Sequence, residues 1–173
     1  LEDALKGYLW MDSRDTTHTS LENARNLQKR GAWDQAETEY RNILKQDSLQ
    51  IEALMGMSTV LLHRKQSTQA VEYLKEAMKA AKQLSNVVEQ NRFLSLIYST
   101  LGGHFETLGA SEQAIKHYKA ALKLNPFASD ILLHLIPVMA KTGSIDDILI
   151  YLTEVGQNYP PYSGFRDTVS EVL

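Results

Sequence analysis

The stretch GAWDQAETEYRNIL (31–44) decides the fold, because close copies of it recur along the chain. The copies are GASEQAIKHYKAAL (109–122), GSIDDILIYLTEVG (143–156) and, with Lys65 in the glycine place, KQSTQAVEYLKEAM (65–78). Ala36 and Ala70, at matching positions of two copies, are 34 residues apart, whereas Ala70 and Ala114 are 44 apart. Self-similarity at a fixed period of this size indicates a repeat architecture with one expanded step.

Each copy reads as the second helix of a two-helix hairpin. Apolar or small residues recur at helical spacing before and after the glycine, as Ala36, Tyr40 and Ile43 do after Gly31. Glycine suits the left-handed residue that ends a first helix, and Pro126 ends a second one. One hairpin cannot bury both of its apolar faces, so neighbouring hairpins must stack. The sequence therefore predicts an all-α fold of stacked antiparallel helix hairpins.

The pattern resembles the tetratricopeptide repeat. That family has a small residue in the first helix, then a small residue, an aromatic and another small residue in the second, then proline. Gly102, Ala114, Tyr118, Ala121 and Pro126 match this pattern best, and the small residues let the two helices approach closely. The resemblance implies a right-handed α-solenoid of four repeats, at residues 17–50, 51–94, 95–128 and 129–162.

Two regions depart from a regular array. The ten extra residues fall within 78–94, which hold no glycine or proline, so we expect lengthened flanking helices with the break at Ser85 and Asn86. In the fourth repeat, Ile136 and Ile148 replace the small residues where the helices cross, and Pro137 lies inside the first helix. A proline there removes one backbone hydrogen bond, which predicts a kinked, atypical outer repeat.

The two ends also read as helices. Residues 1–16 resemble the second helix of a preceding repeat, and residues 163–173 resemble the first helix of a following one. Two interpretations stay open: either the chain is a segment of a longer repeat protein with further domains, or these helices cap the stack and keep it from aggregating.

Composition excludes several classes of function. The 18 basic residues are interleaved with 21 acidic ones, for a net charge of −3, which argues against nucleic-acid binding. No apolar run reaches the roughly 18 residues of a membrane span. The absence of cysteine excludes disulfides and leaves the compartment open, with the cytoplasm as the default expectation.

No pattern of catalysis or of cofactor binding is present. Phosphate-binding loops, nucleophile elbows and histidines at metal-ligand spacing are missing, so we expect no enzyme activity, no cofactor and no metal. Asp130 and His134, four residues apart, read as a surface pair rather than a catalytic dyad.

The resemblance implies that the first helices line a concave face that binds extended or helical peptides. Six residues are the candidate contacts for a peptide or partner protein: Arg25, Lys29, Met55, Thr59, Leu62 and His63. Apolar residues at positions of this face indicate a partner, namely Leu21, Met55, Leu62, Leu96 and Leu133. The alternative is that neighbouring helices or the chain's own ends cover them. Arg25, Lys29 and His63 would favour an acidic segment, unless they belong to an ordinary solvated face.

One known ligand class of the family is excluded by residue type. Members that bind chaperone C-terminal tails use a carboxylate clamp of Lys, Asn, Asn, Lys and Arg. Those positions here hold Leu21, Arg25, Gly56, Leu96 and Thr100, so no clamp is expected. The sequence predicts a non-catalytic interaction scaffold. The competing prediction is a structural spacer or self-assembly segment of a larger repeat protein.

Overall fold

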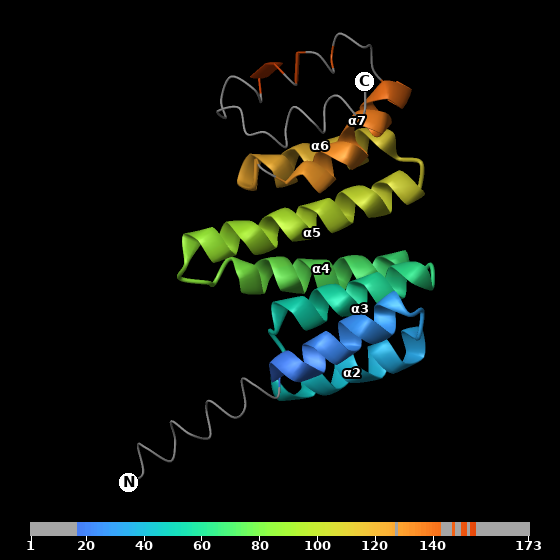
Figure 1. Cartoon of the computed structure of the whole chain (residues 1–173), viewed down its shortest axis with the longest axis vertical. Helices are drawn as coiled ribbons and strands as arrows, with labels where there is room; N and C mark the ends of the chain where they lie inside the picture. The colour runs from blue at the N-terminus through green and yellow to red at the C-terminus, as the bar shows by residue number, and fades with distance from the viewer. Residues whose placement is uncertain (1–16, 127, 143–146, 148–149, 152, 155–173) are drawn as a thin grey trace. The chain divides into compact units, whose positions relative to one another are not determined.

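The computed structural model describes residues 17–126, 128–142, 147, 150–151 and 153–154 (Figure 1). The described residues form α-helices and turns and contain no strand. They divide into an N-terminal unit, which ends at Ala80, and a C-terminal unit, which begins at Ala81. The predictions made for both chain ends, for Ile148 and for the cap at Gly143 lie outside the described residues.

The N-terminal unit consists of a helix over residues 17–29 followed by three labelled helices. These are α2 (Trp33–Gln46), α3 (Ile51–His63) and α4 (Ser67–Ala81), the last ending at the division between the units. Figure 1 shows successive helices running back beside one another, as hairpins do. One buried cluster joins the first three helices: Leu21, Ala24, Ala36, Tyr40, Ile43, Ala53, Met57 and Val60. Tyr73 of α4 packs against its edge.

The C-terminal unit contains α5 (Val87–Thr107), α6 (Ser111–Leu124) and α7 (Ser129–Thr142). α6 packs against both α5 and α7, and α5 also touches α7. One buried cluster comes from α6 and α7: Ala114, Tyr118, Ala121, Leu122, Ile131, Leu132, Leu135, Ile136, Val138 and Met139. The buried hydroxyl of Ser95 in α5 donates to the carbonyl of Ala121 in α6 at 2.9 Å, which ties these two helices together.

The extra residues mainly lengthen α5, which has 21 residues where α3 has 13 and α7 has 14, rather than forming a long loop. α4 ends at Ala81 and α5 begins at Val87. The Asn86 side chain caps α5 by accepting hydrogen bonds from the backbone N–H groups of Val88 and Glu89, at 3.0 and 3.1 Å. The repeat boundary expected between residues 94 and 95 falls inside α5, because this cap starts the helix eight residues earlier.

The hairpin turns have the left-handed residue that the sequence predicts. Gly31 has φ 76° and Gly109 has φ 71°. Lys65, in the glycine place of the second repeat, has φ 61°, a conformation that a side chain disfavours.

In the fourth repeat, Pro137 lies inside α7, and the helix continues on both sides of it. Its side chain is exposed, whereas the adjoining Ile136 and Val138 are buried. Within the described part of the chain, no helix is long and apolar enough to cross a membrane.

Candidate protein-binding surface

A buried tyrosine holds the N-terminal unit together beneath its first helices. The Tyr40 hydroxyl of α2 donates to the side-chain oxygen of Gln28 at 2.9 Å. Its ring lies against Gly56 of α3, where an added Cβ would stand 2.2 Å from Cζ of the ring. Burial raises the pKa of Tyr40. α3 can therefore approach α2 this closely only because residue 56 has no side chain.

The first helices of the N-terminal unit, residues 17–29 and α3, present what we call the N-terminal first-helix face. A guanidinium nitrogen of Arg25 lies 2.7 Å from a carboxylate oxygen of Glu52 across this face. The Arg25 side chain is 44% exposed and that of Glu52 is 29% exposed. Arg25 is therefore already engaged by a carboxylate of its own chain.

The other predicted contact residues differ in exposure. Met55, Thr59 and Leu62 are half-buried along α3, and Lys29 is exposed. The Thr59 hydroxyl donates to the carbonyl of Met55 at 3.1 Å. The expectation that Leu21 contributes to an exposed apolar face is wrong, since it is 4% exposed. Its side chain belongs to the buried cluster, because α2 and α3 close over that side of the helix.

His63, the remaining predicted contact, ends α3 and stacks on Trp33 at the start of α2. The ring centroids are 3.9 Å apart and the planes differ by 16°. Both residues line a shallow hollow whose other walls are Gly31, Ala32, Asp34, Gln35 and Arg64. The structure thus separates His63, which is committed to this stack, from the Arg25–Glu52 pair.

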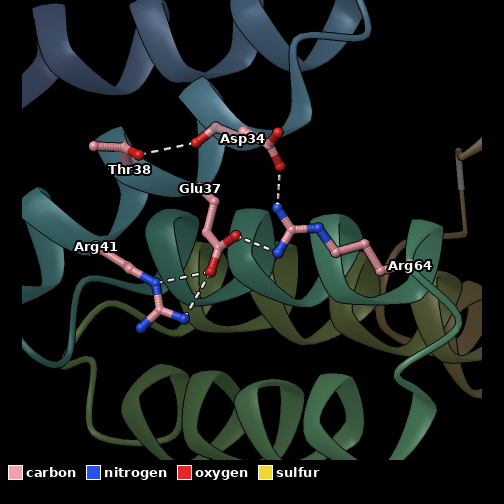
Figure 2. Close-up of polar contacts among 5 residues, drawn as sticks. All are labelled: Asp34, Glu37, Thr38, Arg41 and Arg64. Carbon is pink, nitrogen blue, oxygen red and sulfur yellow. Dashed lines mark hydrogen bonds and ion pairs between the residues drawn. The ribbon is translucent and has the colours of Figure 1, made fainter.

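An ion-pair network fixes the same end of α3 to α2 (Figure 2). The Arg64 guanidinium bridges the carboxylates of Asp34 and Glu37, and Glu37 also accepts from Arg41 Nε at 2.8 Å. The hydrogen bond from Arg41, followed by that from Arg64, lowers the pKa of Glu37 against the opposing effect of burial. The hydrogen bonds with Glu37 and Asp34 raise the pKa of Arg64.

The C-terminal unit places a second tyrosine at the matching point. The Tyr118 hydroxyl of α6 donates to a carboxylate oxygen of Glu106 in α5 at 2.7 Å. Its ring packs against Gly102, where a Cβ would come within 2.6 Å. Burial, and then the hydrogen bond to Glu106, raise the pKa of Tyr118. His134 of α7 stacks near the ring at 6.0 Å between centroids, and its Nδ1 lies 3.9 Å from the same Glu106 oxygen.

Two leucines remain open on the corresponding surface of α5 and α7, which we call the C-terminal first-helix face. Leu96 of α5 is 41% exposed and Leu133 of α7 is 43% exposed. Leu133 neighbours His134, and Leu96 lies on the row of α5 that continues through Gly103 to Glu106 at helical spacing. This face combines exposed apolar side chains with a carboxylate, as peptide-binding surfaces do.

Sequence reasoning missed the cluster of Tyr118, Glu106 and His134. It paired His134 with Asp130 by spacing, whereas the recorded neighbour of His134 is Glu106 on another helix. A usable signal existed, because 78 residues separate Tyr40 from Tyr118 and also Gln28 from Glu106. No comparable signal predicts the Arg64 network, which depends on how α2 meets α3.

Comparison with protein families agrees with this geometry. Residues 21–93 match the model of the tetratricopeptide repeat family. This part of the chain is therefore similar in sequence to tetratricopeptide repeats. This repeat is generally a non-catalytic element of protein interaction, and its close helix crossing accounts for Gly56 and Gly102 beneath the tyrosines. A search of characterised proteins by sequence finds no match.

Solved structures of other proteins with these repeats share the fold. MamA (residues 41 to the end) from Desulfovibrio magneticus RS-1 is 20% identical over 82% of this chain and 74% of its own, with a TM-score of 0.60. The Cut9–Hcn1 structure of the APC/C gives a TM-score of 0.66 at 14% identity, over 91% of this chain and 30% of the other. The first tetratricopeptide repeat domain of Spaghetti (RPAP3), bound to the HSP90 peptide SRMEEVD, gives 0.57 at 20% identity over 74% and 94%. The fold is thus an all-α helical repeat solenoid.

Proposed function

We propose that this protein is an interaction scaffold that binds a peptide of a partner protein along its first-helix faces. The observation that carries the proposal is the exposure of Leu96 and Leu133, each more than 40% open, on the C-terminal face. An apolar side chain left open on a structured helix gains free energy when a partner covers it.

The N-terminal first-helix face belongs to the same proposal in modified form. A half-buried, mostly apolar strip runs along α3 and can pack against a peptide side chain. It consists of Met55, Thr59 and Leu62. Arg25 already forms an ion pair with Glu52, so we expect it to bind an acidic peptide more weakly than an unpaired arginine would. Lys29 and His63 complete the proposed contacts, with His63 acting through its stack on Trp33.

A peptide-display selection against the whole chain tests the proposal. We expect selected peptides to bind the native chain and to lose at least fivefold in affinity for the double variant Leu96→Ser, Leu133→Ser, because about 1 kcal/mol of apolar burial is removed. The matched control is Leu108→Ser, which changes a leucine that is 59% exposed at the end of α5. Equal loss in the control, or binding that ignores all three leucines, would contradict the assignment.

A self-assembly role is the second candidate, and one observation favours it. Val87 and Val88 open α5 with 64% and 80% of their surface exposed. Sedimentation velocity across a hundredfold concentration range would show association that disappears in the variant Val87→Ser, Val88→Ser. A monomer at every concentration would remove this candidate.

A further inference from the structure

Residues of the two first-helix faces correspond to one another in sequence through an offset of 78 residues. Tyr40 corresponds to Tyr118, and Gln28 corresponds to Glu106, with the same hydroxyl-to-side-chain hydrogen bond in each unit. The offset also assigns the ion pair of the N-terminal face. Arg25 corresponds to Gly103, and Glu52 corresponds to Asp130.

The N-terminal face therefore shows what surrounds a carboxylate at this position. Glu52 there is neutralised by Arg25 at 2.7 Å, on a surface where both side chains are partly open to water. In the C-terminal face the carboxylate is kept, as Asp130, but the arginine is replaced by glycine. An added Cβ at Gly103 would meet only the Tyr118 hydroxyl, at 3.5 Å, so the helix packing tolerates a side chain there.

The C-terminal face does not supply a replacement cation from its own helices. Apart from histidines, Glu106 is the sole charged residue of α5 from Leu96 onward, and Asp130 is the sole one of α7 up to Ala140. Among the described residues, neither carboxylate forms a salt bridge with a lysine or arginine, whereas Asp34, Glu37, Glu52 and Glu72 all do. His134 lies 3.9 Å from Glu106 and is 65% exposed.

We propose that the C-terminal first-helix face binds a basic residue of the partner peptide, an arginine or lysine, between Asp130 and Glu106. This inference rests on the proposed function and specifies the chemistry of the partner. The basic side chain takes the place that Arg25 occupies in the N-terminal unit, above Gly103. Apolar neighbours in the peptide cover Leu96 and Leu133. The ligand class is thus a peptide with a basic residue flanked by apolar ones, the opposite charge to an acidic tail.

The selected peptides supply the probes for the test. We expect an arginine or lysine beside apolar residues in the enriched sequences, and about a fivefold loss of affinity when citrulline replaces that arginine or when Asp130→Asn is the target. Affinity should also fall as salt rises, because the pair is partly exposed. A selected peptide with glutamate in place of its arginine should bind at least fivefold more weakly than its parent peptide.

The Gly103→Arg variant gives the most specific test, because it places a guanidinium from the protein's own chain where the basic residue of the peptide is proposed to bind. We expect this variant to keep its fold, by circular dichroism and thermal unfolding, and to lose the preference for arginine over citrulline. Glu112→Gln on α6, an exposed carboxylate outside the face, is the matched control and should leave the preference unchanged.

The two proposals fail in different ways. Selected peptides that bind through Leu96 and Leu133, but carry no basic residue or ignore Asp130→Asn and Gly103→Arg, would overturn this inference and leave the scaffold in place. A selection that yields no peptide dependent on the leucines would overturn the scaffold itself.

Discussion

Each unit buries one tyrosine at the corresponding position, but the residues packed around the ring differ between the two units. In the N-terminal unit, the Tyr40 ring lies against the glycine of the following first helix, Gly56. In the C-terminal unit, the Tyr118 ring lies against Gly102, in the first helix of its own hairpin, and His134 occupies the position of Gly56. The repeat therefore preserves the buried ring and its hydroxyl bond, while the residue that makes room for it changes place.

The largest expected effect breaks this packing in either unit. Gly56→Ala and Gly102→Ala each force a Cβ into a tyrosine ring, at 2.2 and 2.6 Å, and should lower the free energy of unfolding by about 2–3 kcal/mol. Chemical denaturation with hydrogen exchange would show which unit is affected. Gly103→Ala is the control, because its Cβ has room and alanine favours the helix. A neutral result at Gly56 or Gly102 would refute the close crossing.

Glu106→Gln makes the C-terminal tyrosine resemble its N-terminal counterpart, which bonds to Gln28. Replacing a carboxylate by an amide weakens the acceptor, so we expect a loss of about 1 kcal/mol. The pKa of Tyr118 is raised by burial and then by Glu106, so its stabilising contribution is present below the ordinary tyrosine pKa of about 10 and is lost as pH rises through the raised value.

We therefore expect Tyr118 to titrate at lower pH in the folded Glu106→Gln variant than in the parent chain. The measurement is an alkaline titration followed by tyrosinate absorbance, and the Tyr118→Phe variant gives the background from the other tyrosines. An unchanged transition would mean that Glu106 does not contribute to this pKa, and a higher one would mean that Glu106 lowers it.

Lys65→Gly sharpens the comparison at the turns, because Gly31 and Gly109 already use glycine there. Lys65 has φ 61°, so the substitution relieves left-handed strain and should stabilise the N-terminal unit by about 0.5–1 kcal/mol after the entropic cost of glycine. Thermal unfolding is the measurement, and Gly109→Lys is the reciprocal variant that should destabilise. A lower midpoint for Lys65→Gly would contradict the strain.

The smallest effect concerns the ion-pair network around Arg64 in the N-terminal unit. The position of Arg64 corresponds to Thr142 in the other unit, and the position of Glu37 corresponds to Ile115. The pKa of Glu37 is lowered, so its contribution to stability is present above the unfolded glutamate pKa of about 4.3 and is lost as pH falls through the folded value.

The stability difference between the parent chain and Glu37→Gln should therefore shrink between pH 6 and pH 3, as measured by urea unfolding at each pH. Thr142→Ala is the control and should show no such trend. A difference that stays constant over this range would show that the carboxylate is not stabilised by Arg41 and Arg64.

The sequence predicts the parts of this fold that depend on local chemistry. The helix hairpins, the left-handed turns at Gly31 and Gly109, and the helical use of the extra residues follow from periodicity, glycine and propensity. The burial of Leu21 does not follow from local chemistry, because it depends on how far α2 and α3 close over the first helix. The Arg25–Glu52 pair and the His63–Trp33 stack likewise require the crossing geometry of helices some 30 residues apart. The candidate contacts on the first helices therefore stay a prediction, and the charge of that face could not be read from the sequence, because it depends on which side chains pair.

The length of α5 has a consequence for how this protein can diverge. α5 has 21 residues and α6, its hairpin partner, has 14, so about 10 Å of α5 extends past the span that α6 can match. Val87 and Val88 stand at that protruding end with most of their surface in water. Substitutions at these two positions leave the core cluster intact. Contacts with other molecules can therefore be gained or lost at these two positions during evolution without a change in the packing of the repeat.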